Sequence, residues 1–548
     1  MNISRRSVSG SILGILFAAA FGPGAAMADT PAQKQTDTLI YLHAIEPASL
    51  FQWWTQATYP KREILDSLVY LDENGKLHPW LAKSWSQKGT VWTFKLRDDV
   101  SFIDGSRLDA ATVAKNFDFW KKLSTSVPDS YFKEAKVVDQ YTVEFHTTHP
   151  QPYLADMLSS ALFGINSAPS LDRDLKELGE KPIGSGPFYL KEWKHGEEIV
   201  FERNDNYRWG PEGTHGGPAY LKTVHWKFVP DANTRWLALE KGEADVIYDP
   251  PAVKWKDAVS RYTVSQQLAP GRNVALSFNI EAGPFTDKRV RQAFAYASNR
   301  KKIVDSVFRG AVPYEGNGAY SKTTQDYVNL DDQYAYNPEK AIALLKDAGY
   351  DTVNADGYRV NKDGKLLQVV LPLYPNLTNA DGLIAAQALQ AEVKKVGIKL
   401  DTPLLTKTEL AAGRYTKADE YDLYQGYWTL YAPTVLSINY RPAGKNTATT
   451  TIYARQQINK YATDEGEPNP HNRVRLRDWK LQEAIIAAHG ETNPATRKAR
   501  FVALQKQISD DALAIGFYAS AYNVVQQKYL QGLLHNNDAP WFYEVKKN

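Results

Sequence analysis

One short stretch of this chain, Val91-Trp92-Thr93-Phe94-Lys95-Leu96, has the alternating pattern of a half-buried β-strand. Large apolar side chains occupy every second position, and successive side chains of a strand point to opposite faces of a sheet. The stretch therefore predicts a strand with one face in a hydrophobic core. Trp80 and Trp85, which precede it, are predicted to join Trp92 and Phe94 in that core.

Strand and helix patterns alternate outward from this stretch. Asn337-Pro338-Glu339 predicts the start of a helix, with asparagine as the N-cap, proline at the first helical position and an acid in the first turn. Other strands are predicted at residues 38–42, 141–145 and 398–400, and other helices at Asp109, Asp287, Asn299, Gly382 and Asn493. Polar residues 446–470 predict an exposed loop. The alternation predicts an α/β fold with mixed sheets flanked by helices.

Length and charge narrow the class of protein. The chain has 548 residues, several times the size of a typical domain, so we expect two or three lobes. Its 65 basic and 62 acidic residues give a net charge of +3, which predicts no nucleic-acid partner. Because it contains no cysteine, disulfides, thiolate metal sites and cysteine nucleophiles are excluded.

The sequence contains none of the common catalytic motifs that we considered. It has no HExxH, GxSxG or Walker motif, and its ten histidines lack the spacing of metal ligands. We therefore expect no catalytic residue, no metal site and no cofactor. An exported hydrolase stays open as an alternative, because carboxylates from distant positions can converge on a substrate.

The first 28 residues read as an export signal. Arg5-Arg6 precedes the apolar residues 12–21, which are too few to span a bilayer, and Ala26-Met27-Ala28 forms a cleavage site. The arginine pair fits either the twin-arginine pathway or an ordinary secretion signal. No cysteine follows for lipid attachment. We expect a periplasmic protein that is not anchored by lipid.

Five segments, taken in order, resemble the bacterial extracellular solute-binding proteins of family 5. They cover residues 64–70 with 79–105, 182–188 with 203–207, 242–246, 276–279 with 290–297, and 336–341 with 348–350. The second contains Gly184-Ser185-Gly186-Pro187, whose glycines predict a tight turn with backbone angles that favour glycine. One segment alone would be weak evidence, but five in order span most of the chain.

The resemblance implies a two-lobed clamshell that closes on its ligand. It places lobe I in residues 29–55, 183–272 and 510–548, an extra N-terminal subdomain in 56–182, and lobe II in 273–509. The chain is expected to cross between the lobes near residues 270–272 and again near 510–517. The implied function is that of a monomeric receptor that delivers a peptide, nickel complex or opine to the permease and ATPase of an ABC importer.

The resemblance also implies which residues contact the ligand. They are His43, Glu46, Trp53 and Trp54 after the first strand, Phe278 and Asn279 on the crossing strand, Arg414, and Tyr427, Trp428 and Tyr431. Trp428 either stacks on the ligand or packs between the lobes. Asn279 either binds a peptide backbone or stabilises a turn. Arg414 either pairs with a carboxylate or lies on the surface, and Glu46 either binds an amine or faces water.

Two departures from the family pattern leave the ligand class open. Peptide-binding members carry an aspartate shortly after the tryptophan, but residues 429–434 contain no acid. Nickel-chelate binders use an arginine where this chain has Phe163-Gly164-Ile165-Asn166-Ser167. A small or modified peptide, an opine-like conjugate and a metal chelate are all compatible with the sequence. A periplasmic chaperone with exposed aromatic residues is a further alternative.

Overall fold

The computed structural model describes most of the chain after the predicted export signal. The described residues are 37–50, 58–123, 133–148, 150–375, 377–429, 433, 435–440, 472–477, 479–536 and 539–548. The predicted signal at 1–28, Trp53, Trp54, Tyr431 and the predicted loop at 446–470 lie outside them. Residues 37–548 form one compact unit.

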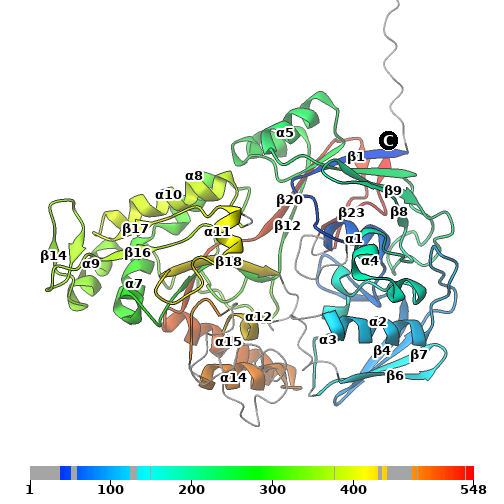
Figure 1. Cartoon of the computed structure of the whole chain (residues 1–548), viewed down its shortest axis with the longest axis horizontal. Helices are drawn as coiled ribbons and strands as arrows, with labels where there is room; N and C mark the ends of the chain where they lie inside the picture. The colour runs from blue at the N-terminus through cyan, green and yellow to red at the C-terminus, as the bar shows by residue number, and fades with distance from the viewer. Residues whose placement is uncertain are drawn as a thin grey trace, which may run out of the picture. The chain divides into compact units, whose positions relative to one another are not determined.

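The largest sheet has seven strands in the order β12-β20-β11-β1-β10-β9-β8. The central strand β1 pairs in parallel with β10 and β11, and the other neighbours are antiparallel. Figure 1 shows that the sheet unites strands from both ends of the chain, blue β1 and red β20 among them. The bounds are β1 Thr38–His43, β8 Phe188–Lys194, β9 Glu198–Arg203, β10 Thr223–Phe228, β11 Val246–Tyr248, β12 Thr263–Leu268 and β20 Ala521–Gln526. The strand predicted at 38–42 is confirmed as β1.

A second sheet of four antiparallel strands, β4-β5-β7-β6, contains the stretch quoted first. The predicted strand at 91–96 is β5 (Val91–Leu96). Trp80, Trp92 and Phe94 are buried as predicted, and Trp85 is partly buried against the same core. The other strands are β4 Ala82–Lys88, β6 Glu134–Asp139 and β7 Thr142–His146, with helices α1 Thr58–Ile64, α2 Ala110–Leu123, α3 Leu154–Leu158 and α4 Leu175–Glu180.

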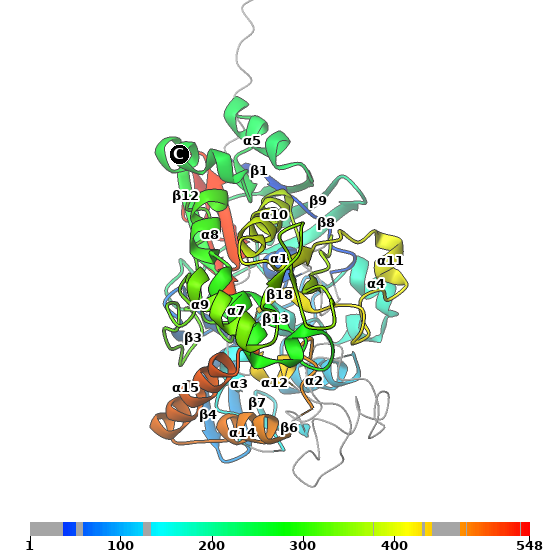
Figure 2. The ribbon, with the colours of Figure 1, turned by 90° about the vertical axis from the view of Figure 1, so that its left-hand side faces the viewer.

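The third sheet has three antiparallel strands in the order β18-β13-β19. Its middle strand, β13 (Gly271–Phe278), is buried at every position, and β18 (Leu423–Thr429) and β19 (Ala514–Tyr518) flank it. Helix α7 packs against α9, α8 against α10, and α14 against α15, as the turned view in Figure 2 also shows for the last pair. The bounds are α7 Lys288–Ala297, α8 Arg300–Phe308, α9 Pro338–Asp347, α10 Ala380–Lys394, α14 Trp479–His489 and α15 Pro494–Asp510.

Helix starts were the most accurate of the sequence predictions. The side chains of Asp287, Asn337 and Asn493 each accept a hydrogen bond from the backbone of the first turn that follows. Helix α10 begins before the predicted Gly382, because the side chain of Asn379 accepts a bond from the backbone N–H of Gly382.

The remaining elements are short. They are α5 Ala232–Lys241, α6 Trp255–Arg261, α11 Lys407–Ala411, α12 Val435–Asn439, the 3-10 turns Ala161–Phe163, Pro169–Asp172, Ala252–Lys254 and Pro284–Thr286, and the strands β2 Val69–Leu71, β3 Leu77–Pro79, β14 Thr352–Val353, β15 Arg359–Val360, β16 Gln368–Val370, β17 Lys399–Asp401, β21 Leu530–Gln531, β22 Leu534–Asn536, β23 Ala539–Trp541 and β24 Lys546–Lys547.

The chain passes twice between the seven-stranded and three-stranded sheets. The first passage, from β12 to β13, lies at Ala269–Pro270, next to the predicted position. The second lies at Ala519–Ser520, a few residues later than predicted, because residues 514–518 still belong to β19 of the smaller sheet. The backbone N–H of Ala269 donates a hydrogen bond to the carbonyl oxygen of Ser520 at 2.8 Å. The predicted lobe boundaries stay a prediction.

Gly184 and Gly186 are needed for close packing and not for unusual backbone angles. Neither has a positive φ, so the prediction of a special turn geometry is wrong. A Cβ atom on Gly184 would lie 2.0 Å from the carbonyl oxygen of Ile64, and one on Gly186 would lie 2.5 Å from the same oxygen. Only glycine lets the two backbone segments approach this closely.

Asp66 joins three segments of the chain beneath these glycines. Its carboxylate accepts bonds from Ser185 Oγ and Trp209 Nε1, both at 2.9 Å, and from the Tyr207 hydroxyl at 3.4 Å. Burial raises the pKa of Asp66 to about 7, while these donors and Arg62 act in the opposite direction. The carboxyl group is therefore a buried polar anchor with its own partners.

Gly184→Ala should destabilise the fold, since the obstructing atom is backbone and cannot rotate away. We expect the free energy of unfolding to fall by about 1–3 kcal/mol, the usual cost of overpacking. Urea unfolding followed by tryptophan fluorescence measures the change. Gly217→Ala is the control, because its Cβ would meet nothing closer than 3.5 Å. Equal midpoints for the two variants would contradict this account.

Glu63 should make stability depend on pH. It is fully buried, and burial raises its pKa from 4.5 to about 8, although a bond from the backbone N–H of Phe542 opposes the shift. A carboxyl group with a raised pKa stabilises the folded state fully below the unfolded value, and that contribution is lost as pH rises from about 4.5 to about 8.

Glu63→Gln cannot ionise and keeps the shape of the side chain. The free energy of unfolding of this variant relative to the wild type should therefore increase between pH 5 and pH 8, by roughly 1 kcal/mol or more. Urea titrations at pH 5, 6.5 and 8 test this, with Glu73→Gln on the exposed surface as the control. A difference that stays constant across this range would refute the assignment.

Candidate ligand-binding site

Trp428, a predicted ligand contact, lies near the end of the edge strand β18. It stands opposite Arg272 of β13 in the antiparallel register. Opposite residues of an antiparallel pair carry their side chains on the same face, so Trp428 and Arg272 are neighbours. Trp428 is half-buried and packs against a cluster, here called the aromatic cluster, whose buried members include Tyr153, Tyr320, Val435, Leu436, Tyr440 and Phe501.

Tyr427 faces the opposite side of β18 and packs against the core that contains Tyr518. The seven-stranded and three-stranded sheets approach each other here. Thr429 Oγ1 of β18 lies 3.4 Å from the hydroxyl of Tyr522 on β20, and Gln425 Nε2 donates to the hydroxyl of Tyr518 at 3.3 Å. Tyr427 and Trp428 thus lie next to the passages between the seven-stranded and three-stranded sheets.

Tyr153 connects the segment predicted as the subdomain with the C-terminal helix α15. Its hydroxyl accepts from Arg497 Nε at 2.9 Å and donates to Asp326 Oδ2 at 3.2 Å. The guanidinium carbon of Arg497 also lies 4.9 Å from the centre of the Tyr153 ring. Burial, followed by the charge of Asp326, raises the pKa of Tyr153, so the hydroxyl stays protonated at neutral pH.

Arg272 is a buried cation, with 4% of the residue exposed. Its Nη2 donates to Ser277 Oγ at 2.5 Å, and its Nη1 lies 3.5 Å from Asn439 Oδ1. Its Nε–H has no hydrogen-bond partner, and no Asp or Glu forms an ion pair with it among the residues that the structure describes. Burial lowers the pKa of the guanidinium, while the hydroxyls of Tyr440 and Tyr424 act in the opposite direction.

Two carboxyl groups lie close together at the other side of the junction. Asp249 follows β11 with a positive φ of 47°, and Asp381 is in the first turn of α10. Asp249 Oδ2 is 3.5 Å from Asn379 Nδ2, and Asp381 Oδ2 accepts from the backbone N–H of Ala252 at 3.3 Å. Burial raises the pKa of both groups, and for Asp249 the charge of Arg235 opposes the shift while that of Asp381 adds to it.

Two of the predicted contacts after the first strand, His43 and Glu46, have partners within the protein. His43 ends β1, is buried, and accepts from the backbone N–H of Ile45 at 3.2 Å; burial lowers its pKa to about 4. Glu46 accepts from Trp193 Nε1 at 2.9 Å and from the backbone N–H of Gly196 at 3.0 Å, and it lies 3.0 Å from His195 Nδ1. Its carboxylate thus holds the turn between β8 and β9, an alternative that the sequence did not suggest.

Three more predicted contacts make interactions with other residues of the protein. They are Phe278, Asn279 and Arg414. Phe278 has no exposed surface and packs edge-on against Phe285 with ring centres 4.8 Å apart. The amide of Asn279 donates to the carbonyls of Ala418 and Tyr421 at 2.7 and 2.8 Å, and accepts from the backbone of Glu281 at 3.1 Å. Arg414 is exposed, pairs with Glu409 and lies over Tyr415. These contacts fit the turn-stabilising reading of Asn279 and the surface reading of Arg414.

Sequence reasoning missed Arg272, Asn439 and Tyr440, which the structure brings together beside Trp428. Asn439 and Tyr440 come from the end of α12, about 170 residues away from Arg272. One signal for Arg272 was present: it is the one charged residue of β13, a strand that is buried at every position. The predicted contacts Trp53, Trp54 and Tyr431 lie outside the described residues and stay predictions.

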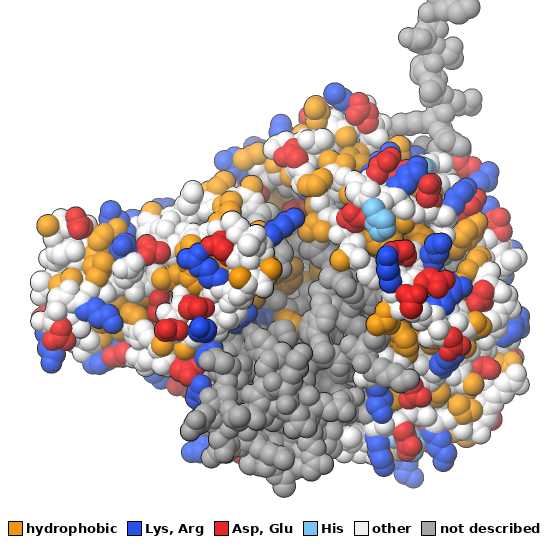
Figure 3. Space-filling model, viewed as in Figure 1, with side chains coloured by type: hydrophobic (Ala, Val, Ile, Leu, Met, Phe, Trp, Pro, Cys, Tyr) orange, Lys and Arg blue, Asp and Glu red, His pale blue; other side chains and the backbone are white. Residues whose placement is uncertain are grey.

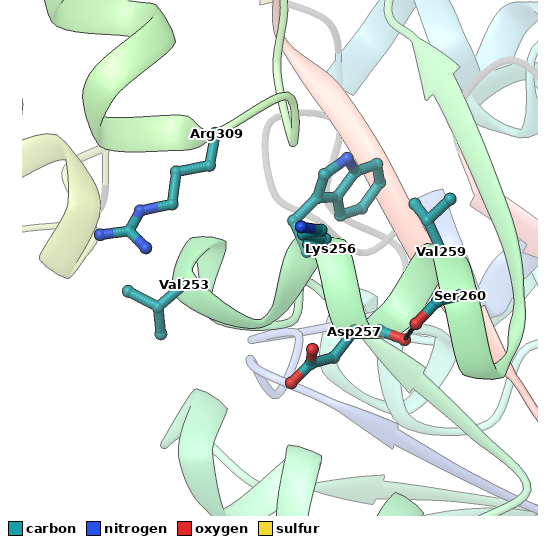
Figure 4. Close-up of a pocket in the computed structure, with 7 residues that line it drawn as sticks. Val253, Lys256, Asp257, Val259, Ser260 and Arg309 are labelled. Atoms are coloured by element: carbon teal, nitrogen blue, oxygen red, sulfur yellow. Dashed lines mark hydrogen bonds between the residues drawn. The ribbon is translucent and has the colours of Figure 1, made fainter.

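A surface pocket of about 640 Å³ lies elsewhere, along α6. It is lined by Val253, Trp255, Lys256, Asp257, Val259, Ser260 and Arg309. Figure 4 shows that these side chains come from α6, the 3-10 turn before it and the end of α8. No predicted contact residue lines this pocket, so we do not place the ligand there.

The described surface and helices add three observations. Figure 3 shows basic and acidic side chains interspersed on the face in view. Within the described ranges, no three or more His, Asp or Glu side chains are placed to hold a metal ion. Among the same residues, no helix is both long and apolar enough to pass through a bilayer.

Comparison with solved structures identifies the fold. The structure of NikA from Brucella suis in complex with Fe(III)-EDTA matches with a TM-score of 0.77, covering 93% of this chain and 100% of that one at 22% identity. The fold is therefore that of the two-lobed periplasmic binding proteins, as predicted.

The family follows from the sequence comparisons. The model of the bacterial extracellular solute-binding proteins, family 5, matches residues 76–449. The nickel-binding periplasmic protein of Escherichia coli K12 is 30% identical over 61% of this chain and 64% of its own length, and the glutathione-binding protein GsiB of Salmonella paratyphi A is 26% identical over 86% and 94%. The chain belongs to the bacterial extracellular solute-binding proteins of family 5, which are binding proteins and not enzymes.

Trp428→Ala should weaken ligand binding. A half-buried aromatic residue beside a buried cation is the kind of side chain whose truncation costs more than about 1 kcal/mol, or at least about fivefold in Kd. Isothermal titration with a ligand found by the screen described below measures the change. Trp85→Ala, in the four-stranded sheet, is the control and should leave Kd unaltered. A Kd within about twofold of the wild-type value for Trp428→Ala would remove this residue from the site.

Proposed function

We propose that this chain is the substrate-binding receptor of a bacterial ABC importer and captures a small peptide or peptide-like ligand between its two lobes. The observation that carries the proposal is the position of Tyr427 and Trp428 at the end of β18, beside both passages between the sheets. Membership of family 5 supports the receptor role. We further propose that the receptor is an exported monomer that binds without turnover and delivers its ligand to a permease and ATPase complex.

A metal chelate is the second ligand class that we propose. It is favoured by the similarity to the nickel-binding protein of E. coli and to the Brucella structure with Fe(III)-EDTA. Glutathione, the ligand named for the Salmonella relative, represents the peptide-like class. Both classes consist of small polar molecules that carry carboxylates, so one site chemistry serves either.

Ligand capture would work by shifting the population between open and closed forms. A ligand that contacts groups on both sides of the junction binds the closed form better, and it stabilises that form by its difference in affinity. The junction holds suitable groups, since Trp428 belongs to the three-stranded sheet and Tyr248 and Tyr522 belong to the seven-stranded one. The permease would then recognise the closed form.

A thermal-shift screen followed by calorimetry tests the proposal. Glutathione, dipeptides, an opine and nickel–histidine are added to the purified mature protein at matched ionic strength. A true ligand should bind with 1:1 stoichiometry and add about 2.7 kcal/mol of stability at one hundred times its Kd. Buffer with the uncomplexed metal is the control for the chelate. The absence of stabilisation by every class would argue against the proposed ligands.

A further inference from the structure

The guanidinium of Arg272 is buried without a compensating negative charge in the described part of the chain. Most buried charges in proteins are paired, because removing a charge from water is costly unless an opposite charge or several hydrogen bonds replace the lost solvation. The two bonds from Arg272, to Ser277 and Asn439, use two of its five N–H groups and involve neutral acceptors. The described part of the chain thus supplies no charged partner for this residue.

Two further polar groups beside Arg272 are buried without partners. Among the described residues, the Nδ2 amide group of Asn439 and the hydroxyl of Tyr440 have no hydrogen-bond partner, although Asn439 is only 5% exposed and Tyr440 has no exposed surface. Arg272 Nε, Asn439 Nδ2 and Tyr440 Oη are all able to donate. Three unpartnered donors and one positive charge in a single cluster match an anion that has several acceptor oxygens.

The position of the cluster connects it with the ligand. Arg272 stands opposite Trp428 on the neighbouring strand, two residues after the passage at Ala269–Pro270. Tyr440 belongs to the aromatic cluster against which Trp428 packs. An anion held by these donors would therefore lie beside the aromatic residue that we expect to contact the ligand.

We propose that Arg272, Asn439 and Tyr440 form a subsite that binds a carboxylate group of the ligand. The proposal rests on the receptor function proposed above and specifies the chemistry of its ligand. One guanidinium and two neutral donors balance the single negative charge of a carboxylate better than the larger charge of phosphate, and a guanidinium pairs with a carboxylate through two parallel bonds. Trp428 would cover the apolar part of the same ligand.

Formate is the probe, because it is the smallest carboxylate and does not depend on knowledge of the ligand. Thermal unfolding of the mature protein is followed while chloride is replaced by formate at constant ionic strength. The wild type should be stabilised by formate, and Arg272→Met should lose this response. Arg359→Met is the matched control, because Arg359 is buried with backbone carbonyl partners and lies outside the cluster.

Tyr440→Phe provides a second variant that keeps the cation. It should respond to formate with an apparent affinity weaker by about fivefold, the effect of losing one hydrogen bond. The subsite is refuted if formate leaves the wild type unchanged, if it stabilises Arg272→Met equally, or if Arg359→Met also loses the response. A stronger, Arg272-dependent response to phosphate than to formate would overturn the assignment to carboxylates.

Binding measurements with the ligands of the screen test the subsite separately from the receptor function. For each compound that binds, the form with its carboxylates amidated should bind at least about tenfold more weakly to the wild type, and this difference should disappear in Arg272→Met. An unchanged affinity of Arg272→Met for a confirmed ligand refutes the subsite and leaves the receptor function intact. An Arg272-dependent formate response without any ligand from the screen supports the subsite and counts against the proposed ligand classes.

Discussion

The structure depends on a pair of strands that run side by side through both of the sheets that flank the junction. β12 pairs with β20 in the seven-stranded sheet, and their continuations β13 and β19 pair in the three-stranded sheet. The bond from Ala269 to Ser520 joins the two passages between the sheets. A two-stranded ribbon bends out of its plane more easily than within it, because in-plane bending must slide one strand along the other and break such bonds. Arg272 belongs to this ribbon and Trp428 to the strand beside it, so a ligand at the proposed subsite would lie close to the axis of a lobe movement.

Three buried charged groups, Asp66, Arg235 and Arg272, have two different kinds of surroundings. Asp66 has three side-chain donors, and Arg235 donates to the carbonyls of Val229, Pro230, Tyr248 and Asp249. Each of these groups is satisfied by the protein itself, and its role is to connect segments. Arg272 differs because its neighbours in the described ranges are neutral and three donor groups of its cluster have no partner there. This contrast in hydrogen bonding, together with the position beside Trp428, is the reason for proposing that a ligand completes the environment of Arg272.

Local patterns were predictable from the sequence, and long-range partners were not. The strand at 91–96 and the helices capped by Asn337 and Asn493 depend on neighbouring residues, so a single sequence reveals them. The reason for Gly184 was misjudged because the obstructing atom belongs to Ile64, 120 residues earlier. The same limit applies to the site: the partners of Asn279 lie about 140 residues away, and those of Glu46 about 150. Trp428 was predicted as a ligand contact from the family resemblance, and that role stays a prediction, whereas Arg272, Asn439 and Tyr440 meet only in three dimensions.

The order of strands in the largest sheet has a consequence for biosynthesis. β20 lies between β12 and β11, and the last residues of the chain add Trp541, Phe542 and Tyr543 to the core that surrounds β1. The sheet that contains β1 is therefore complete only after β20, near the end of the described residues, has been synthesised. Because domains fold as units during synthesis, this lobe cannot finish folding on the ribosome.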